Sequence, residues 1–296
     1  MGDVVQLQNP ETVVSLGVLG PLFVSSPSPR KTPTARKPRN VLAMLLVHAD
    51  QVVPVSVLVS ELWDDEPPVS RLTTLQTYIL NLRKMFVAVT GLPAEEVTRS
   101  LLITRAGGYL LRGDRIALDV REYQRLMSAG CAALGLGDDV TGTRRLTEAL
   151  GLWRGPALVD VPLGRVLESK RRELEESWLM ASEYLVGAKL RQGMYREALI
   201  ELTALTAENP LHEGLQAQYM RALHLSGRRA QALEVFHRLR RNLVDELGLE
   251  PEPQVQRIHQ AILNAETDFE DDLRVIRPFP SEVAATSWGR VRVRAS

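Results

Sequence analysis

Short apolar runs and helix-spaced apolar residues alternate along the first 112 positions. Residues 13–24 (VVSLGVLGPLFV) form a β-branched run that Gly20-Pro21 interrupts, which predicts two short strands around a turn. Apolar residues then recur at helical spacing over about 38–49, 54–63 and 70–89. Strand-like runs at 101–105 and 109–112 flank Ala106-Gly107-Gly108, whose glycines allow a tight hairpin turn. Strands, three helices and a hairpin in this order predict a winged helix-turn-helix.

The third predicted helix has two distinct faces. Ser70 is placed to cap it, and an apolar stripe that favours burial consists of Leu72, Leu75, Ile79, Leu82 and Phe86. The opposite face has no acidic residue and consists of Thr73, Thr77, Asn81 and Lys84, with Thr74, Gln76 and Arg83 on its flanks. Such a face can approach phosphates and base edges without electrostatic repulsion. We interpret it as a DNA-reading surface, with an ordinary solvated face as the alternative.

From residue 116 onward the pattern is helical. Asp119 and Glu122 have the spacing of a capping box. Further helices are predicted over about 138–152, 163–192, 195–209, 210–225, 228–247 and 253–264. Residues 193–199 (GMYREAL) recur as 227–233 (GRRAQAL), an offset of 34 residues that matches the tetratricopeptide period. The predicted fold is mostly α with small β: an N-terminal winged helix-turn-helix followed by an all-α, tetratricopeptide-like helical domain.

These patterns also predict how the chain is divided. We expect a tail at 1–12, a winged helix-turn-helix DNA-binding domain at 13–112, a helical domain at 113–268 and a disordered tail at 269–296. Residues 25–38 are rich in Ser, Pro, Arg and Lys and are expected to form a mobile basic loop. A fragment that ends near Arg112 is expected to bind DNA by itself.

The distribution of charge supports two different tasks for the two halves. Residues 13–112 contain eleven basic and seven acidic side chains, whereas the whole chain has a formal net charge of zero. A basic front half and an acidic back half suit a phosphate-facing domain joined to a protein-facing one. Cys131 is the single cysteine, and no apolar run is long enough to span a membrane. The sequence therefore predicts a cytoplasmic, nucleoid-associated protein without a membrane partner.

Motifs that would indicate an enzyme are missing from the sequence. No Gly-Lys pair exists, so there is no P-loop, and His212-Glu213 lacks the second histidine of a zinc motif. The remaining histidines, which are scattered along helical stretches, are expected to be solvated: His48, His224, His237 and His259. We predict that the protein is not an enzyme and has no catalytic residues, no cofactor and no metal site.

Several motifs in order resemble the Streptomyces antibiotic regulatory protein family. In the first half they are residues 14–20 (VSLGVLG), 61–63 (ELW) before Pro67-Pro68, 75–79 (LQTYI) leading to Leu82-Arg83-Lys84, and 108–110 (GYL). In the second half they include 149–155 (ALGLWRG), 209–213 (NPLHE), 238–243 (RLRRNL) and 246–251 (ELGLEP). The resemblance covers about residues 13 to 265 and implies an OmpR-type winged helix followed by a bacterial transcriptional activation domain.

The resemblance also implies a function and roles for individual residues. Members are expected to bind direct repeats in double-stranded DNA near a promoter, to self-associate there, and to recruit RNA polymerase through contacts that include its sigma factor. Carried onto this chain, the DNA-binding residues are Thr73, Thr74, Thr77, Asn81, Arg83, Lys84 and Arg105. Thr77 and Asn81 would face bases; Thr73, Arg83 and Lys84 would hold phosphates; Arg105 would enter the minor groove. The chain departs from the family at Leu80 and Asn81, where related regulators often carry arginine.

A second class of function stays open at this point. The chain could be a repeat-containing interaction scaffold whose winged helix contacts proteins and does not bind DNA. A protein-contact face would favour exposed aromatic or leucine side chains over threonine, asparagine and lysine. The residues of the third helix therefore favour the sequence-specific transcriptional activator, with antibiotic or other secondary metabolite biosynthesis as the pathway that the resemblance implies.

Overall fold

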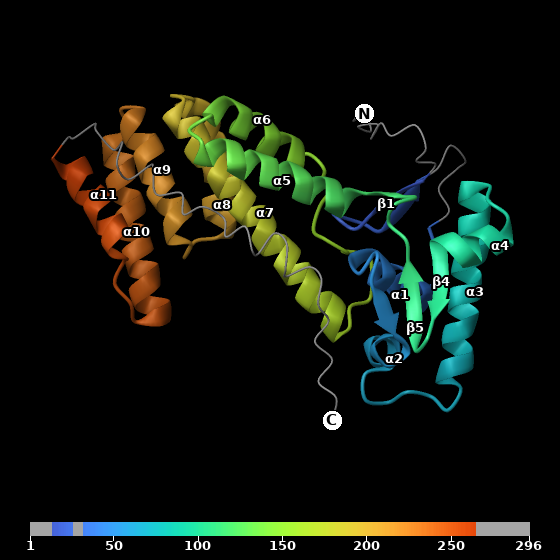
Figure 1. The fold of residues 1–296 in the computed structure, drawn as a ribbon. Coiled ribbons are helices and arrows are strands. Elements are labelled where there is room, and N and C mark those ends of the chain that lie inside the picture. Colours follow the sequence, from blue (N-terminus) through green and yellow to red (C-terminus); the bar gives the residue numbers. More distant parts are fainter. Residues whose placement is uncertain (1–13, 26–31, 265–296) are drawn as a thin grey trace. The chain divides into compact units, whose positions relative to one another are not determined.

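The structure is a computed structural model that describes residues 14–25 and 32–264 (Figure 1). The tails expected at 1–12 and 269–296 lie outside these residues, and so do residues 26–31 of the expected basic loop. The described chain forms two compact units. The first contains the residues up to Leu126 together with Ala149–Trp178, and the second contains Met127–Glu148 together with the residues from Leu179 onward.

Two three-stranded sheets belong to the first unit. β1 (Ser15–Gly17) pairs antiparallel with β2 (Phe23–Ser25), as the interrupted apolar run predicts, and parallel with β6 (Ala117–Leu118). In the other sheet, β5 (Gly108–Leu111) lies between β3 (Val52–Pro54) and β4 (Leu102–Arg105) and is antiparallel to both. The sequence pattern did not predict β3 and β6, because strands this short show no clear alternation and form through pairing with distant residues.

Three helices lie between the sheet segments in the predicted order: α1 (Arg36–Val47), α2 (Val55–Trp63) and α3 (Arg71–Thr90). The apolar stripe of α3 is confirmed at Leu75, Ile79, Leu82 and Phe86, which are buried in the core. Leu72 is wrongly assigned to that stripe, because the preceding residues 64–70 are exposed and offer its side chain no core, which leaves it 52% exposed.

Ser70 is the N-cap residue of α3, but the expected capping bond does not form. Its backbone has φ −80° and ψ 10° rather than the extended conformation that turns a hydroxyl toward the first helical N–H groups. The serine hydroxyl instead lies 3.4 Å from Thr74 Oγ1. α3 is followed by α4 (Ala94–Glu96) and by a π-helical turn (Val97–Leu101) that buries Val97 and Leu101.

A buried carboxylate joins the start of α5 (Asp119–Gly135) to the loop after β1. Asp119 accepts hydrogen bonds of 3.0 Å from the backbone N–H groups of Val18 and Leu19, and one of 2.7 Å from Arg154 Nη2. Burial raises the pKa of the Asp119 carboxyl, and these three donors oppose the rise. The predicted capping box is therefore wrong in its role, because the side chain faces another segment and not its own helix.

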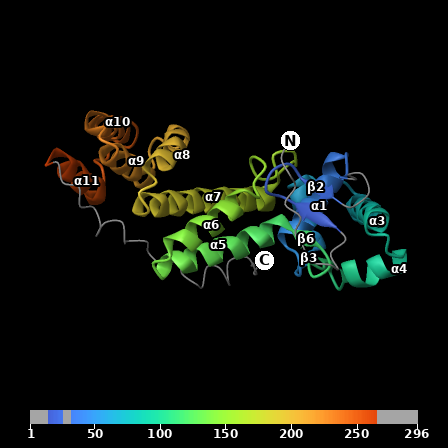
Figure 2. The ribbon, with the colours of Figure 1, turned by 90° about the horizontal axis from the view of Figure 1, so that it is seen from above.

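The helices of the second half follow the predicted order closely. They are α6 (Asp139–Leu150), α7 (Arg165–Arg191), α8 (Tyr195–Glu208), α9 (Glu213–Leu225), α10 (Arg229–Leu247) and α11 (Pro253–Leu263). Figure 2 shows α8 to α11 as neighbouring helices, with α9 packed against α8, α10 and α11. Gly193 and Gly227 turn the chain with φ of 74° and 75°. Ala198 and Ala232, five residues after each turn, are fully buried. The tetratricopeptide-like arrangement is confirmed.

Candidate nucleic-acid interface

The surface of α3 opposite the core is polar and exposed. Its exposed side chains are Thr73, Gln76, Thr77, Leu80, Asn81 and Lys84, and Thr74 is half-buried on its flank. The helix contains no acidic residue along its 20 positions. The apolar stripe on the other side anchors α3 to α1 and to the rest of the core, so this face is held on a rigid support.

Hydroxyl groups near the start of this face bond within the helix. Thr77 Oγ1 donates to the Thr73 carbonyl oxygen at 3.0 Å, one turn earlier. Such a bond uses the hydroxyl proton and leaves the oxygen able to accept. In this conformation Thr77 offers an acceptor to an approaching ligand, whereas the amide of Asn81 offers both donors and an acceptor.

Arg83 has a structural task that sequence reasoning missed. Its Nε and Nη2 atoms donate to the Leu102 carbonyl oxygen at 3.1 and 2.9 Å, and Nη2 also lies 2.9 Å from Thr104 Oγ1. Partial burial lowers the pKa of this guanidinium. The side chain therefore fastens β4 to α3. No local signal distinguishes it from a phosphate-binding arginine, because both partners lie about twenty residues away.

β4 and β5 form a hairpin (Figure 1). Arg105 is the last residue of β4, next to the turn. Arg105 pairs with Gly108, so the turn consists of two residues, Ala106 and Gly107. Gly107 has a φ of 75°, which a two-residue hairpin turn requires and which glycine adopts without steric cost. The Arg105 side chain is exposed. Through Arg83 the strand that carries Arg105 is attached to the helix that carries Lys84.

The described end of the basic loop lies beside α3. Pro33, Thr34, Ala35 and Pro38 line a cavity of about 290 Å³ together with Asn81, Leu82 and Met85. Arg36, on the same segment, is exposed, and the Lys37 ammonium lies 4.5 Å from the centre of the Trp63 ring. Arg36 and Lys37 were not among the predicted site residues, although the basic composition of 25–38 was the signal that could have identified them.

Acidic side chains near the start of α3 are partly neutralised within the first unit. Asp64 and Asp65 precede α3 in the exposed turn, and Arg165 Nη2 lies 2.9 and 3.3 Å from their carboxylates. Exposed or half-buried cations, in contrast, lie on three elements of the unit: Arg36 and Lys37 in α1, Lys84 in α3 and Arg105 in β4. The arrangement can accept an extended polyanion along α3 and the hairpin.

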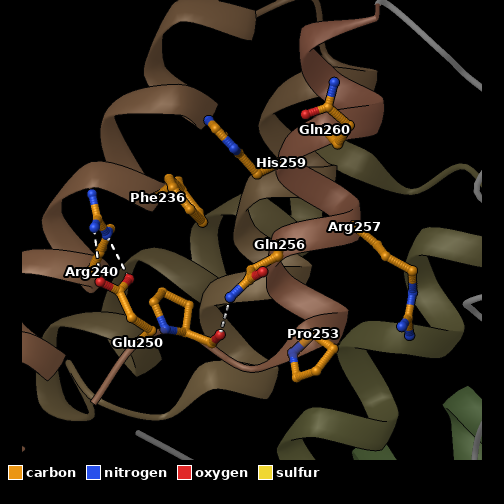
Figure 3. A pocket seen from close by; sticks show the side chains of 9 residues that line it. Phe236, Arg240, Glu250, Pro253, Gln256, Arg257, His259 and Gln260 are labelled. Atoms are coloured by element: carbon orange, nitrogen blue, oxygen red, sulfur yellow. Dashed lines mark hydrogen bonds and ion pairs between the residues drawn. The ribbon is translucent and has the colours of Figure 1, made fainter.

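An open groove of about 660 Å³ lies in the second unit between α10 and α11 (Figure 3). Arg240 donates to the Glu250 carboxylate at 2.6 and 2.8 Å, and Gln256 Nε2 donates to the Pro251 carbonyl oxygen at 2.7 Å. The His259 ring stacks on Phe236 with a centroid distance of 3.7 Å. These three contacts join α10, the α10–α11 connection and α11 to one another, so the residues that line the groove have a structural role.

Two negative observations concern the described ranges 14–25 and 32–264. Among these residues, His, Cys, Asp and Glu side chains nowhere gather in threes as a metal ion would need. Within the same ranges, no helix has the length and apolarity to cross a bilayer.

Comparison with known proteins matches the two halves of the chain to two family models. Residues 30–111 match the model described as "Transcriptional regulatory protein, C terminal", and residues 118–263 match the "Bacterial transcriptional activator domain". The chain is 44% identical over 253 residues to the regulatory protein DnrI of Streptomyces peucetius, covering 86% of this chain and 93% of that protein. It is 34% identical over 250 residues to the transcriptional regulator RedD of Streptomyces coelicolor, covering 84% and 70%.

Longer proteins also match. The regulatory protein AfsR of Streptomyces griseus is 35% identical over 252 residues, which cover 85% of this chain but 25% of that protein. Among solved structures, EmbR of Mycobacterium tuberculosis, in complex with a low-affinity phosphopeptide, superposes with a TM-score of 0.80 at 30% identity. That match covers 86% of this chain and 66% of the EmbR chain.

Proposed function

Because the chain belongs to the Streptomyces antibiotic regulatory protein family, which consists of transcriptional regulators, we propose that it binds double-stranded DNA and activates transcription of genes for secondary metabolite biosynthesis. Its place of action is then the nucleoid in the cytoplasm. The observation that carries the proposal is the exposed face of α3, which has no acidic residue and carries Lys84, together with the exposed Arg105 at the end of β4.

We assign the contacts from where each side chain lies. Asn81 and Thr77 face base edges in the major groove, and Thr73, Thr74 and Lys84 face phosphates on either side. Arg105 enters the adjacent minor groove. Arg83, which the sequence suggested as a phosphate contact, sets the position of the hairpin relative to α3 through its bonds to Leu102 and Thr104.

The second unit is the proposed protein-contact half. Exposed apolar side chains gather at the end of α10 and just after it, at Val244, Leu247 and Leu249. Such side chains suit contact with protein more than with DNA. We assign to this unit the contact with RNA polymerase, including its sigma factor, and self-association of copies bound to direct repeats in the DNA.

A second candidate function has one observation in its favour. Leu80 and Leu72 are exposed on α3, and exposed leucine is what a protein-contact face favours. An interaction scaffold whose winged helix does not bind DNA therefore remains the alternative, and the experiment below separates the two.

The test begins with selection of duplexes from a random-sequence pool by the full chain. If about six to eight phosphates are neutralised, affinity for the selected duplex should fall by orders of magnitude between low and moderate salt.

Asn81→Ala should reduce the free energy of binding to the selected duplex by about 1–3 kcal/mol, because it removes a base contact. Binding of this variant to random DNA should change little. Lys84→Ala is the matched variant, about one helical turn later. It should weaken binding to the selected and the random duplex equally, and it should reduce the salt dependence of binding. Failure to enrich any sequence would rule the proposal out in favour of the scaffold.

A further inference from the structure

Leu80 is an apolar side chain in the middle of the polar face of α3. It is 50% exposed, whereas Ile79 and Leu82 beside it are buried. With about 3.6 residues per helical turn, its neighbours along the face are three or four residues away. These neighbours, Thr77, Gln76 and Lys84, are polar and exposed. Leu80 therefore projects from the same surface as the side chains proposed to contact DNA.

A single exposed leucine is ordinary on a protein surface, so the argument rests on its position. If α3 lies in the major groove, the side chains on this face meet base edges. Those edges present nitrogen and oxygen atoms and one apolar group, the C5-methyl of thymine. Leucine cannot form hydrogen bonds, and placing it against base N–H or oxygen atoms would remove their water without replacing it. The thymine methyl is the base-edge group that Leu80 can contact favourably.

We infer that Leu80 is a specificity-determining residue that selects thymine through its C5-methyl group. The inference rests on the proposed function, since it requires α3 in the major groove. Asn81 follows directly in the sequence, and its amide can pair with N6 and N7 of adenine. Two consecutive residues of α3 thus favour the two bases of A·T pairs, one by apolar contact and the other by hydrogen bonds.

Deoxyuridine provides a test, because it differs from thymidine in the base only by the missing methyl group. The probes are the duplexes that the full chain selects from the random pool, with each thymine replaced in turn by deoxyuridine. At one thymine in each half-site, the substitution should weaken binding of the wild-type protein about fourfold, the effect of removing one buried methyl group. With Leu80→Ala the thymine and deoxyuridine duplexes should bind equally at that position.

Leu72→Ala is the matched control, because Leu72 lies on the same helix with a nearly equal exposed fraction of 52%. This variant should keep the fourfold response at the thymine assigned to Leu80. If no thymine responds to loss of its methyl, or if Leu80→Ala responds as strongly as the wild type, the inference is overturned while DNA binding stands. A wild-type chain that selects no duplex overturns the proposed function, and the inference with it.

Discussion

His48 illustrates how the environment of one side chain changes its chemistry. It follows α1 directly, is 3% exposed, and its Nδ1 atom lies 2.9 Å from the Met44 carbonyl oxygen. Burial lowers the pKa of the imidazole below its ordinary 6.5, and Lys170 lowers it further, whereas the Met44 hydrogen bond and Glu173 act in the opposite direction. The folded protein therefore holds His48 neutral under conditions in which the unfolded chain begins to bind a proton there.

This difference predicts acid sensitivity. The folded-state pKa is depressed, so the unfolded state binds more protons and stability falls as the pH drops through the ordinary histidine value. Between pH 7.5 and 5.5 the free energy of unfolding should decrease by up to about 1.4 kcal/mol through this residue. His48→Gln should remove that part of the decrease, measured by urea unfolding of both proteins at the two pH values. An identical pH dependence in wild type and variant would contradict the assignment.

The expectation that His48 is solvated was wrong, and the reason is physical. Residues 45–48 (LLVH) fit the end of an amphipathic helix, and nothing in that pattern shows that Lys170 and Glu173 lie near the ring. The same limit applies to Arg83, whose partners are on β4. Thr73, Thr77, Asn81 and Lys84 were placed on exposed positions by periodicity alone, because exposure on one helix face is a local property.

At the scale of elements, the repeat in the second unit depends on two small side chains. Ala198 in α8 and Ala232 in α10 occupy equivalent positions and have no exposed surface. A methyl group at these positions lets neighbouring helices approach closely. The 34-residue offset was visible in the sequence because the two helix pairs repeat the same packing.

Ala232→Leu should therefore overpack the contact and cost about 1–3 kcal/mol in the free energy of unfolding. The matched control is Ala230→Leu, because Ala230 lies on the same helix with its side chain exposed. That control should change stability by no more than about 0.5 kcal/mol. Urea unfolding of both variants measures the difference. Equal stability of the two variants would show that the Ala232 site tolerates bulk and that the close approach is unimportant.

Local patterns predicted long helices better than short elements. The helices from α6 to α11 begin and end within about three residues of the expected positions, because an amphipathic stripe recurs over several turns. β3, β6 and the π-helical turn at 97–101 have no such repeat. Their formation depends on partners supplied by the rest of the fold, such as β1 for β6.

At the scale of the molecule, the first unit extends past the boundary expected near Arg112. Beyond that residue, its core includes Leu118, Tyr123, Leu158 and Leu167. The side chain of Glu61 in α2 accepts hydrogen bonds from the backbone N–H groups of Gly164 and Val166, at 2.7 and 2.8 Å, and from Leu167 at 3.3 Å. These contacts join residues about a hundred positions apart, which is why no local pattern could predict them.

The hydrogen bonds of Glu61 belong to a larger set of contacts between the winged helix and residues 160–167. Asn40 Nδ2 donates to the Pro162 carbonyl oxygen at 2.7 Å beside them, and Arg39 pairs with Asp160. A buried carboxylate that accepts several backbone bonds stabilises the segment that provides the donors. Without residues 157–167, Glu61 would lose these donors, and the apolar side chains that pack against the segment would be exposed to water.

The structure therefore predicts that a fragment ending near Arg112 does not form a stable DNA-binding domain, in contrast to the expectation from the sequence. Residues 1–112 should show no cooperative thermal transition and should bind the selected duplex far more weakly than the full chain. Residues 1–178 retain the whole described core of the first unit and should melt cooperatively and bind that duplex. Circular dichroism during heating and a binding titration measure both properties. Glu61→Ala in the full chain is the point-mutation counterpart, and it should lower the free energy of unfolding by about 3 kcal/mol, because it leaves buried N–H groups without an acceptor. A cooperative transition and full affinity for residues 1–112 would show that the segment 149–178 is dispensable and that the winged helix folds alone.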